Sequence, residues 1–254
     1  MSTTFTYEGF DIPLDLARMT GGGEETWHDI TVGHLLEYEK YCPVRPHDHV
    51  LEIGCGVGRD AIGLSKILGP DGHYVGIDII RPSIEWCQSH ITPRFPNFEF
   101  RCLNIRSEIH NPGGDLQVRQ ISLPVETQSV DRIILQSVFT HMFEDDIVHY
   151  LKEFRRALRP EGRVFASWFV LDDETLQMAR GVPDGELTFE FEFGDGCFVN
   201  DERYPEGAVG FTPEAFERIL SRGGFELDQP LHRGFWCGRQ GVSDGQDIAI
   251  LRAL

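Results

Sequence analysis

Apolar and polar segments alternate from about residue 48 onward, and the alternation predicts strands and helices in turn. Short apolar segments predict buried strands, and apolar residues at the i, i+3, i+4 spacing predict helices. The predicted strands are His49–Ile53, His73–Asp78, Phe98–Leu103, Val130–Ser137, Gly162–Val170, Phe225–Phe235 and Asp247–Leu251. The predicted helices are Arg59–Leu68, Pro82–Ile91, Asp145–Leu158 and Pro213–Arg222. Alternation in this order favours a parallel sheet with helices on both faces, an α/β fold.

Two segments do not follow this repeat. Residues 1–41 are predicted to form a polar extension followed by a helix at Trp27–Tyr41. In the acidic segment 171–210, phenylalanines alternate with glutamates over residues 189–193 before Gly194-Asp195-Gly196, which is typical of a hairpin. One interpretation packs these phenylalanines on the sheet edge or on a second subunit, as in a homodimer. The other makes the segment a lid over the substrate.

Composition limits the classes of protein. The 254 residues, 41% of them hydrophobic, are enough for one α/β core, and we expect a single domain over residues 1–254. The net charge of -18 disfavours nucleic acid as a partner, because basic side chains supply most nucleic-acid affinity. No apolar segment is long enough to cross a bilayer, and residues 1–10 do not resemble a signal peptide, so we expect a soluble cytoplasmic protein. Six cysteines without a CxxC pair predict reduced thiols and no metal site.

The segment "HVLEIGCGVGRDAIGLS" leads from the first strand into the first helix through three alternating glycines. Glycines at such a corner let the backbone approach a ligand closely, although a tight turn alone is the simpler interpretation. A dinucleotide fingerprint would need glycine at position 59, where Arg59 stands, so a nicotinamide dehydrogenase is disfavoured. The carboxylate of Glu52 suits a ligand with an ammonium and a sulfonium better than a pyrophosphate.

These glycines and three later segments resemble the class I S-adenosylmethionine-dependent methyltransferases. The later segments are "CLNI", "ISLPVETQSVDRIILQSVFTHM" and "FRRALRPEGRV". The resemblance implies a doubly wound Rossmann-like sheet of seven strands with the last one antiparallel. It implies S-adenosyl-L-methionine as the cofactor, S-adenosyl-L-homocysteine as its product, and a small-molecule acceptor as the partner. The cofactor-binding residues it implies are Glu52, Gly54, Cys55, Gly56, Gly58, Asp78, Ile79, Asn104, Ile105 and Gln136.

Three of these residues have structural alternatives. Asp78 could cap the helix predicted from Pro82, Asn104 could turn the chain after a strand, and Gln136 could be a polar group at a strand end.

His141 is the candidate general base, because it follows the fourth strand by a few residues and ligands of open α/β folds bind at that edge of the sheet. The alternative is that His141 caps the next helix. "SVFTHM" and the later "GFWCGR" and "QD" resemble a bacterial subgroup that methylates sugar and other hydroxyls, which implies Trp236 and Arg239 in the acceptor pocket. Trp236 could also be core packing. An N- or carboxyl-methyltransferase and a non-catalytic cofactor-binding protein stay open as alternatives.

Overall fold

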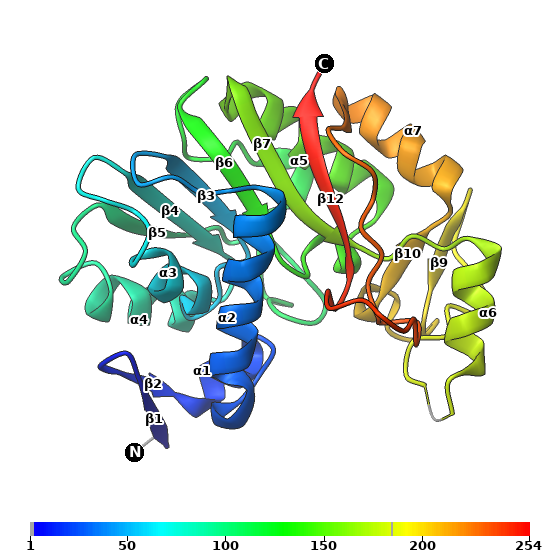
Figure 1. Ribbon diagram of the computed structural model, residues 1–254, viewed down its shortest axis with the longest axis horizontal. Helices are drawn as coiled ribbons and strands as arrows, with labels where there is room; N and C mark the ends of the chain where they lie inside the picture. Colours follow the sequence, from blue (N-terminus) through cyan, green and yellow to red (C-terminus); the bar gives the residue numbers. More distant parts are fainter. Residues whose placement is uncertain (1–2, 184) are drawn as a thin grey trace. The chain divides into compact units, whose positions relative to one another are not determined.

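One sheet of seven strands is present in the computed structural model, which describes residues 3–183 and 185–254. In hydrogen-bonding order its strands are β11 (Phe225–Leu227), β12 (Asp247–Ala253), β7 (Leu158–Trp168), β6 (Val130–Leu135), β3 (His49–Ile53), β4 (His73–Asp78) and β5 (Phe98–Cys102). β3, β4 and β5 pair in parallel, whereas β12, the last strand in the chain, runs antiparallel to β7. The predicted α/β sheet with an antiparallel last strand is confirmed (Figure 1).

The described chain divides into two compact units. The first contains residues 3–116 and 130–134, and the second contains residues 117–129, 135–183 and 185–254. The single domain over residues 1–254 stays a prediction. Met1 and Ser2 of the predicted extension, and Asp184 of the predicted insertion, lie outside the described residues.

The first unit contains β3, β4, β5 and three helices that the sequence predicted with small errors at their ends. They are α2 (Glu24–Tyr41), α3 (Arg59–Leu64) and α4 (Arg81–His90). α2 begins earlier than predicted because Gly23 is its N-cap and donates its N–H to the Thr26 hydroxyl (3.1 Å). α3 was predicted to extend to Leu68 but ends at Leu64. Its C-cap is Ser65, whose hydroxyl donates to the carbonyl of Ile62 (2.7 Å).

The predicted polar extension is structured, which the sequence analysis missed. Strands β1 (Thr4–Tyr7) and β2 (Phe10–Pro13) form an antiparallel hairpin, and helix α1 (Leu14–Met19) follows. The turn residues Glu8 and Gly9 have positive φ angles of 49° and 76°. Phe5, Phe10 and Ile12 of the hairpin are buried, so this segment is part of the core of the first unit.

The second unit contains β7, β11, β12 and the helices α5 (Glu144–Ala157) and α7 (Pro213–Gly223). Thr212 caps α7 as predicted, and its hydroxyl accepts from the N–H of Ala215. β7 begins at Leu158 rather than Gly162, because the residue before Pro160 is biased toward extended backbone. β11 stops at Leu227, well before the predicted Phe235, and Pro230 has no N–H to continue a strand ladder.

The insertion in the second unit holds a helix and a small sheet. Helix α6 (Asp173–Gly181) was not predicted, and its N-cap Asp172 accepts from the N–H of Thr175. β8 (Phe191–Glu192), β9 (Cys197–Val199) and β10 (Val209–Phe211) pair antiparallel, which confirms the predicted hairpin. The phenylalanines of residues 189–193 differ in their surroundings. Phe189, at φ 47°, is fully buried, whereas Phe193 is half exposed.

Candidate functional site

The loop between β3 and α3 is bent by three glycines with positive φ angles. These angles are 77° at Gly54, 53° at Gly56 and 78° at Gly58, a region that side chains disfavour. The N–H groups of Gly54 and Cys55 donate to the carbonyl of Ile77 (2.7 and 3.1 Å), which holds the loop against β4. The loop is therefore a fixed backbone cradle at the N-terminus of a helix.

Asp78 connects this loop to the next strand-to-helix junction. Its side chain is buried, and its Oδ2 accepts from the N–H of Gly56 (2.7 Å) while Oδ1 accepts from Ile80 (2.8 Å). Burial raises the pKa of Asp78, although these backbone hydrogen bonds oppose the shift. α4 has Ile80 as its N-cap and no side-chain cap, so Asp78 does not have the capping role that was the alternative. A carboxylate accepts about four hydrogen bonds, so Asp78 can still accept from a ligand hydroxyl beside its backbone partners.

Asn104 and Ile105 follow β5 and begin the loop to residue 116. The Asn104 amide donates to Asp115 (2.9 Å) and accepts from Asn111 (3.2 Å), so its side chain shapes this loop as the chain-turning interpretation requires. Ile105 is buried, and Ile79 lies half-buried after Asp78. A role of these residues in cofactor binding stays a prediction.

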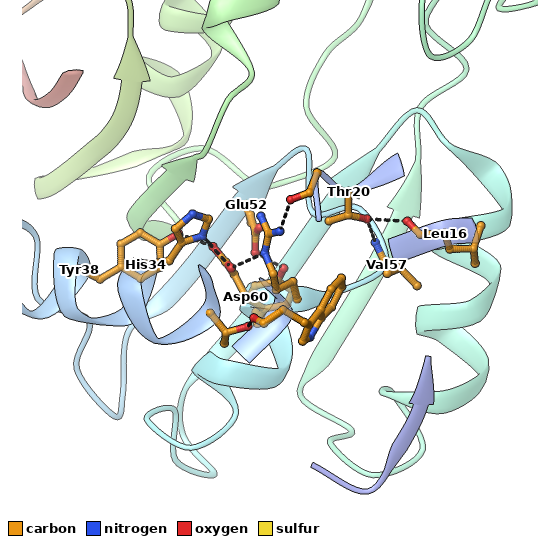
Figure 2. Close-up of polar contacts among 12 residues, drawn as sticks. Leu16, Thr20, His34, Tyr38, Glu52, Val57 and Asp60 are labelled. Carbon is orange, nitrogen blue, oxygen red and sulfur yellow. Dashed lines mark hydrogen bonds and ion pairs between the residues drawn. The ribbon is translucent and has the colours of Figure 1, made fainter. Parts of the chain in front are cut away.

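Glu52 and Asp60 are buried carboxylates beside the glycine loop, and Figure 2 shows both. Glu52 accepts from the hydroxyl of Tyr74 (2.5 Å). Asp60 accepts from the hydroxyl of Tyr38 (2.5 Å) and contacts Nδ1 of His34 (2.9 Å). The contacts of Asp60 join α2 to α3, and that of Glu52 joins β3 to β4.

The two carboxylates differ in acidity because their partners differ. Burial, followed by the negative charge of Asp60, raises the pKa of Glu52 well above its usual range. Burial also works against ionisation of Asp60, but the His34 imidazole, the Arg59 guanidinium and the Tyr38 hydroxyl outweigh it and lower the pKa to about 2. Asp60 is thus the anion at neutral pH, and Glu52 keeps its proton more readily.

The N-terminal segment also reaches the glycine loop, which the sequence analysis did not foresee. The Thr20 hydroxyl accepts from the N–H of Val57 (3.1 Å) and donates to the carbonyl of Leu16 (3.0 Å), as Figure 2 shows. Arg59 donates to the carbonyl of Gly21 (2.9 Å). A Cβ on Gly56 would lie 2.4 Å from the Thr20 side chain. Close packing by Thr20 is therefore a second reason for glycine at position 56.

The remaining predicted residues belong to the second unit. Gln136 follows β6 and lies half-buried before Ser137, which has a positive φ of 56°. His141 ends the short helical turn η2 (Phe139–His141), so it does not cap α5, whose N-cap is Phe143. The second unit holds two further turns of this kind, η1 (Val118–Gln120) and η3 (Pro205–Gly207).

In the late motif, residues 234–239 with Gln246 and Asp247, Trp236 packs on neighbouring aromatic residues, whereas Phe235 is half exposed. Trp236 packs edge-on against Phe169 and Phe189 with ring centroids 4.9 and 5.5 Å apart, as the core-packing alternative expects. Asp247 is buried and accepts from the N–H groups of Val170 and Gly234 (both 2.9 Å).

Gln246 and Arg239, the polar residues of the late motif, each have a side-chain partner in the second unit. Gln246 donates to the Ser137 hydroxyl (3.0 Å), and a guanidinium nitrogen of Arg239 lies 3.6 Å from the Glu174 carboxylate. Contact of Trp236 and Arg239 with an acceptor stays a prediction.

Within the described residues, no group of three or more His, Cys, Asp or Glu side chains is arranged to hold a metal ion. The six cysteines are free thiols. Among the helices that the structure describes, none combines the length and the apolar character needed to cross a membrane.

A family model described as a methyltransferase domain matches residues 45–198. The chain is 29% identical over 132 residues to the demethylmenaquinone methyltransferase of Lactobacillus johnsonii, a match that covers 52% of this chain and 48% of that protein. It is 26% identical over 163 residues to an arsenite methyltransferase of Aquipseudomonas alcaligenes, with 64% and 44% covered. The chain thus spans about half, or less, of the length of the curated relatives it matches.

A solved structure shows a similar fold. It is the 1,6-didemethyltoxoflavin-N1-methyltransferase of Burkholderia thailandensis with bound 1,6-didemethyltoxoflavin and S-adenosylhomocysteine. The TM-score is 0.55 at 18% identity, and the match covers 91% of this chain and 79% of that chain.

Proposed function

Because the chain belongs to the family of S-adenosyl-L-methionine-dependent methyltransferase domains, we propose that it is an O-methyltransferase acting on a hydroxyl of a sugar or of a sugar-bearing small molecule. The similar proteins act by name on demethylmenaquinone, arsenite and 1,6-didemethyltoxoflavin, which favours a small molecule as the acceptor. Their acceptors differ in the atom methylated, so the choice of a hydroxyl depends on His141.

The residues of the first unit fit the cofactor. When bound, S-adenosyl-L-methionine supplies a methyl group on a positively charged sulfonium. The buried carboxylate of Asp78 would accept from a ribose hydroxyl, and the positive-φ glycines keep Cβ atoms out of the loop so that a ligand can approach its backbone closely. Glu52, whose pKa burial raises, is a carboxylate that an ammonium or sulfonium would stabilise as the anion. The assignment of the cofactor site depends most on the hydrogen bond from the N–H of Gly56 to the carboxylate of Asp78.

The proposed role of His141 is to take the proton of the acceptor hydroxyl as its oxygen attacks the methyl carbon and the bond from that carbon to sulfur breaks. An unactivated hydroxyl is a poor nucleophile, and a positioned base typically contributes about a hundredfold or more to the rate. His141 follows β6, and ligands of open α/β folds bind at the carboxyl ends of the strands. An amine acceptor would need less help from a base, so an N-methyltransferase remains the second candidate.

Two measurements test the proposal. Titration calorimetry with S-adenosylmethionine, S-adenosylhomocysteine and NAD should show binding of the first two and not of NAD. A methyl-transfer screen over sugars, phenols and amines then identifies the acceptor. Binding without transfer to any acceptor class would favour the non-catalytic alternative.

The base is tested with a matched pair of variants once the acceptor is known. His141→Ala should lower turnover about a hundredfold or more and leave cofactor affinity unchanged. His149→Ala is the control, because His149 is also half-buried in the second unit and its Nε2 also contacts a backbone carbonyl, that of Ile121 (2.9 Å). Equal turnover in the two variants would refute the assignment.

A further inference from the structure

The ring of His141 contacts a backbone carbonyl in the insertion. Its Nδ1 lies 2.8 Å from the carbonyl oxygen of Glu206. A carbonyl oxygen only accepts hydrogen bonds, so Nδ1 bears a proton in this contact. A neutral imidazole has a single N–H, and the lone pair of the neutral ring is therefore on Nε2.

The direction of this carbonyl is fixed by the chain on both sides of it. Glu206 lies in the turn η3, whose Gly207 donates its N–H to the carbonyl of Tyr204 (2.8 Å). The next residue, Ala208, accepts from the N–H of Asn200 (3.1 Å), and the β9–β10 pairing follows directly. The carbonyl of Glu206 is thus part of a closed turn at the end of a hairpin.

The insertion itself is fastened within the second unit. Phe193 stacks on Phe143 with ring centroids 4.9 Å apart, and Arg218 donates to the carbonyl of Asp195 (2.7 Å). The side chain of Asn200 accepts from the N–H of Thr188 (2.7 Å). These contacts hold the insertion against the N-cap of α5 and against α7, and the hydrogen bond of His141 to Glu206 joins its turn η3 to η2.

We propose that η3 is the positioning element of His141, and that the Glu206 carbonyl selects the tautomer in which Nε2 is the proton acceptor. The inference rests on the proposed function, because a base must offer an unprotonated nitrogen to the acceptor hydroxyl. In water a neutral histidine favours the opposite tautomer, with the proton on Nε2, in which Nε2 has no lone pair to accept the proton of the hydroxyl. The hydrogen bond made by one ring nitrogen decides the state of the other. The insertion therefore acts on the reaction through His141.

The tautomer is measured directly by nitrogen NMR on the full-length protein with labelled histidines, at alkaline pH where histidine is neutral. The His141→Gln variant identifies the signals of this ring by their loss. We expect a protonated, pyrrole-like Nδ1 and a pyridine-like Nε2 in the wild-type protein. A protonated Nε2 in the wild-type protein would overturn the proposal.

Two substitutions at one position separate the turn from the side chains around it. Gly207→Pro removes the N–H that closes the turn and biases Glu206 away from a helical conformation, so the signals should shift toward the other tautomer. Gly207→Ala is the matched control, because its Cβ would lie 4.0 Å from the nearest atom, and it should keep the wild-type signals. Glu206→Ala keeps the carbonyl and should also leave them unchanged.

The same variants separate this inference from the proposed function. Affinity for S-adenosylhomocysteine, measured by calorimetry, should be equal in all of them, which also shows that they are folded. A Gly207→Pro protein that binds this probe and keeps the wild-type tautomer would overturn the positioning role. If the Gly207→Pro protein does not fold, the tautomer of His141 in the wild-type protein tests the proposal by itself, and a protonated Nε2 there overturns it. Absence of binding in the wild-type protein contradicts the proposed function and leaves the tautomer result standing.

Discussion

Replacement of Asp60 by asparagine should destabilise the protein by about 2–5 kcal/mol at neutral pH. The lower figure follows from the fall of its pKa from 3.8 to about 2, which corresponds to about 2 kcal/mol. The upper figure is the usual cost, about 3–5 kcal/mol, of removing one partner from a buried charged pair. The Asp60 carboxylate accepts hydrogen bonds from both the Tyr38 hydroxyl and the ring N–H of His34. The asparagine side chain has only one acceptor oxygen, so its NH2 group would face one of these two donors.

The effect of Asp60→Asn should depend on pH with a defined sign. Because the pKa of Asp60 is lower in the folded protein, its contribution is complete well above an unfolded value of 3.8 and is lost as the pH falls toward about 2. The difference in free energy of unfolding between wild type and variant should fall by about half between pH 7 and about pH 3.

Urea unfolding followed by tryptophan fluorescence measures this difference, since the fully buried Trp27 lies in the same unit. Asp29→Asn is the control, because Asp29 is exposed on the same helix as His34 and Tyr38 and should change stability by less than about 0.5 kcal/mol. The reasoning fails if Asp60→Asn costs no more than this control, or if its cost is the same at pH 7 and pH 3.

Three further substitutions test the first unit. Gly56→Ala should destabilise the protein by about 1 kcal/mol or more, because position 56 has a positive φ and an added Cβ would clash with Thr20. This cost should be smaller in a Thr20→Ala background. If urea unfolding shows that the costs of the two substitutions simply add, the reasoning is contradicted. Asp78→Ala should weaken S-adenosylmethionine binding by a few kcal/mol, and calorimetry showing wild-type affinity in a folded variant would count against it. Because burial raises the pKa of Glu52 and a cationic ligand favours its ionised form, the affinity for S-adenosylmethionine should rise with pH above the usual glutamate value of 4.5, and calorimetry on Glu52→Gln should show a smaller rise.

The sheet could be predicted from the sequence because its elements have local signals. The ends of β3 and β4 were predicted correctly, since each is a short apolar segment bounded by polar or glycine residues. The β1–β2 hairpin was missed although Phe10 and Ile12 alternate with polar residues. Its turn is Glu8-Gly9, and glutamate is not among the residues that usually mark a two-residue hairpin turn.

The candidate site was predictable where one backbone motif defines it. Gly54, Gly56 and Gly58 are adjacent in sequence, and their spacing alone indicates a turn into a helix. The contact of Thr20 with Val57 joins residues 37 positions apart, and that of His34 with Asp60 joins residues 26 positions apart. Such pairs depend on tertiary packing, which no local pattern contains.

The signal that the sequence holds for Asp60 is weak. Asp60 stands beside the apolar Ala61 and Ile62, but only the structure shows that all six residues of α3 are buried, so that this aspartate needs partners to offset its desolvation. No local pattern identifies His34 and Tyr38 as those partners.

The buried carboxylates of the first unit have opposite effects on folding and therefore different relations to a ligand. Asp60 is compensated by partners of the protein itself, and its lowered pKa makes folding more favourable as the pH rises above about 2. Glu52 has a tyrosine hydroxyl as its partner, and its raised pKa makes folding less favourable as the pH rises past the usual glutamate value of 4.5. A cationic ligand would remove that cost. The attraction between such a ligand and the ionised Glu52 would offset the cost of ionising this buried group, an effect that a neutral or anionic ligand could not provide.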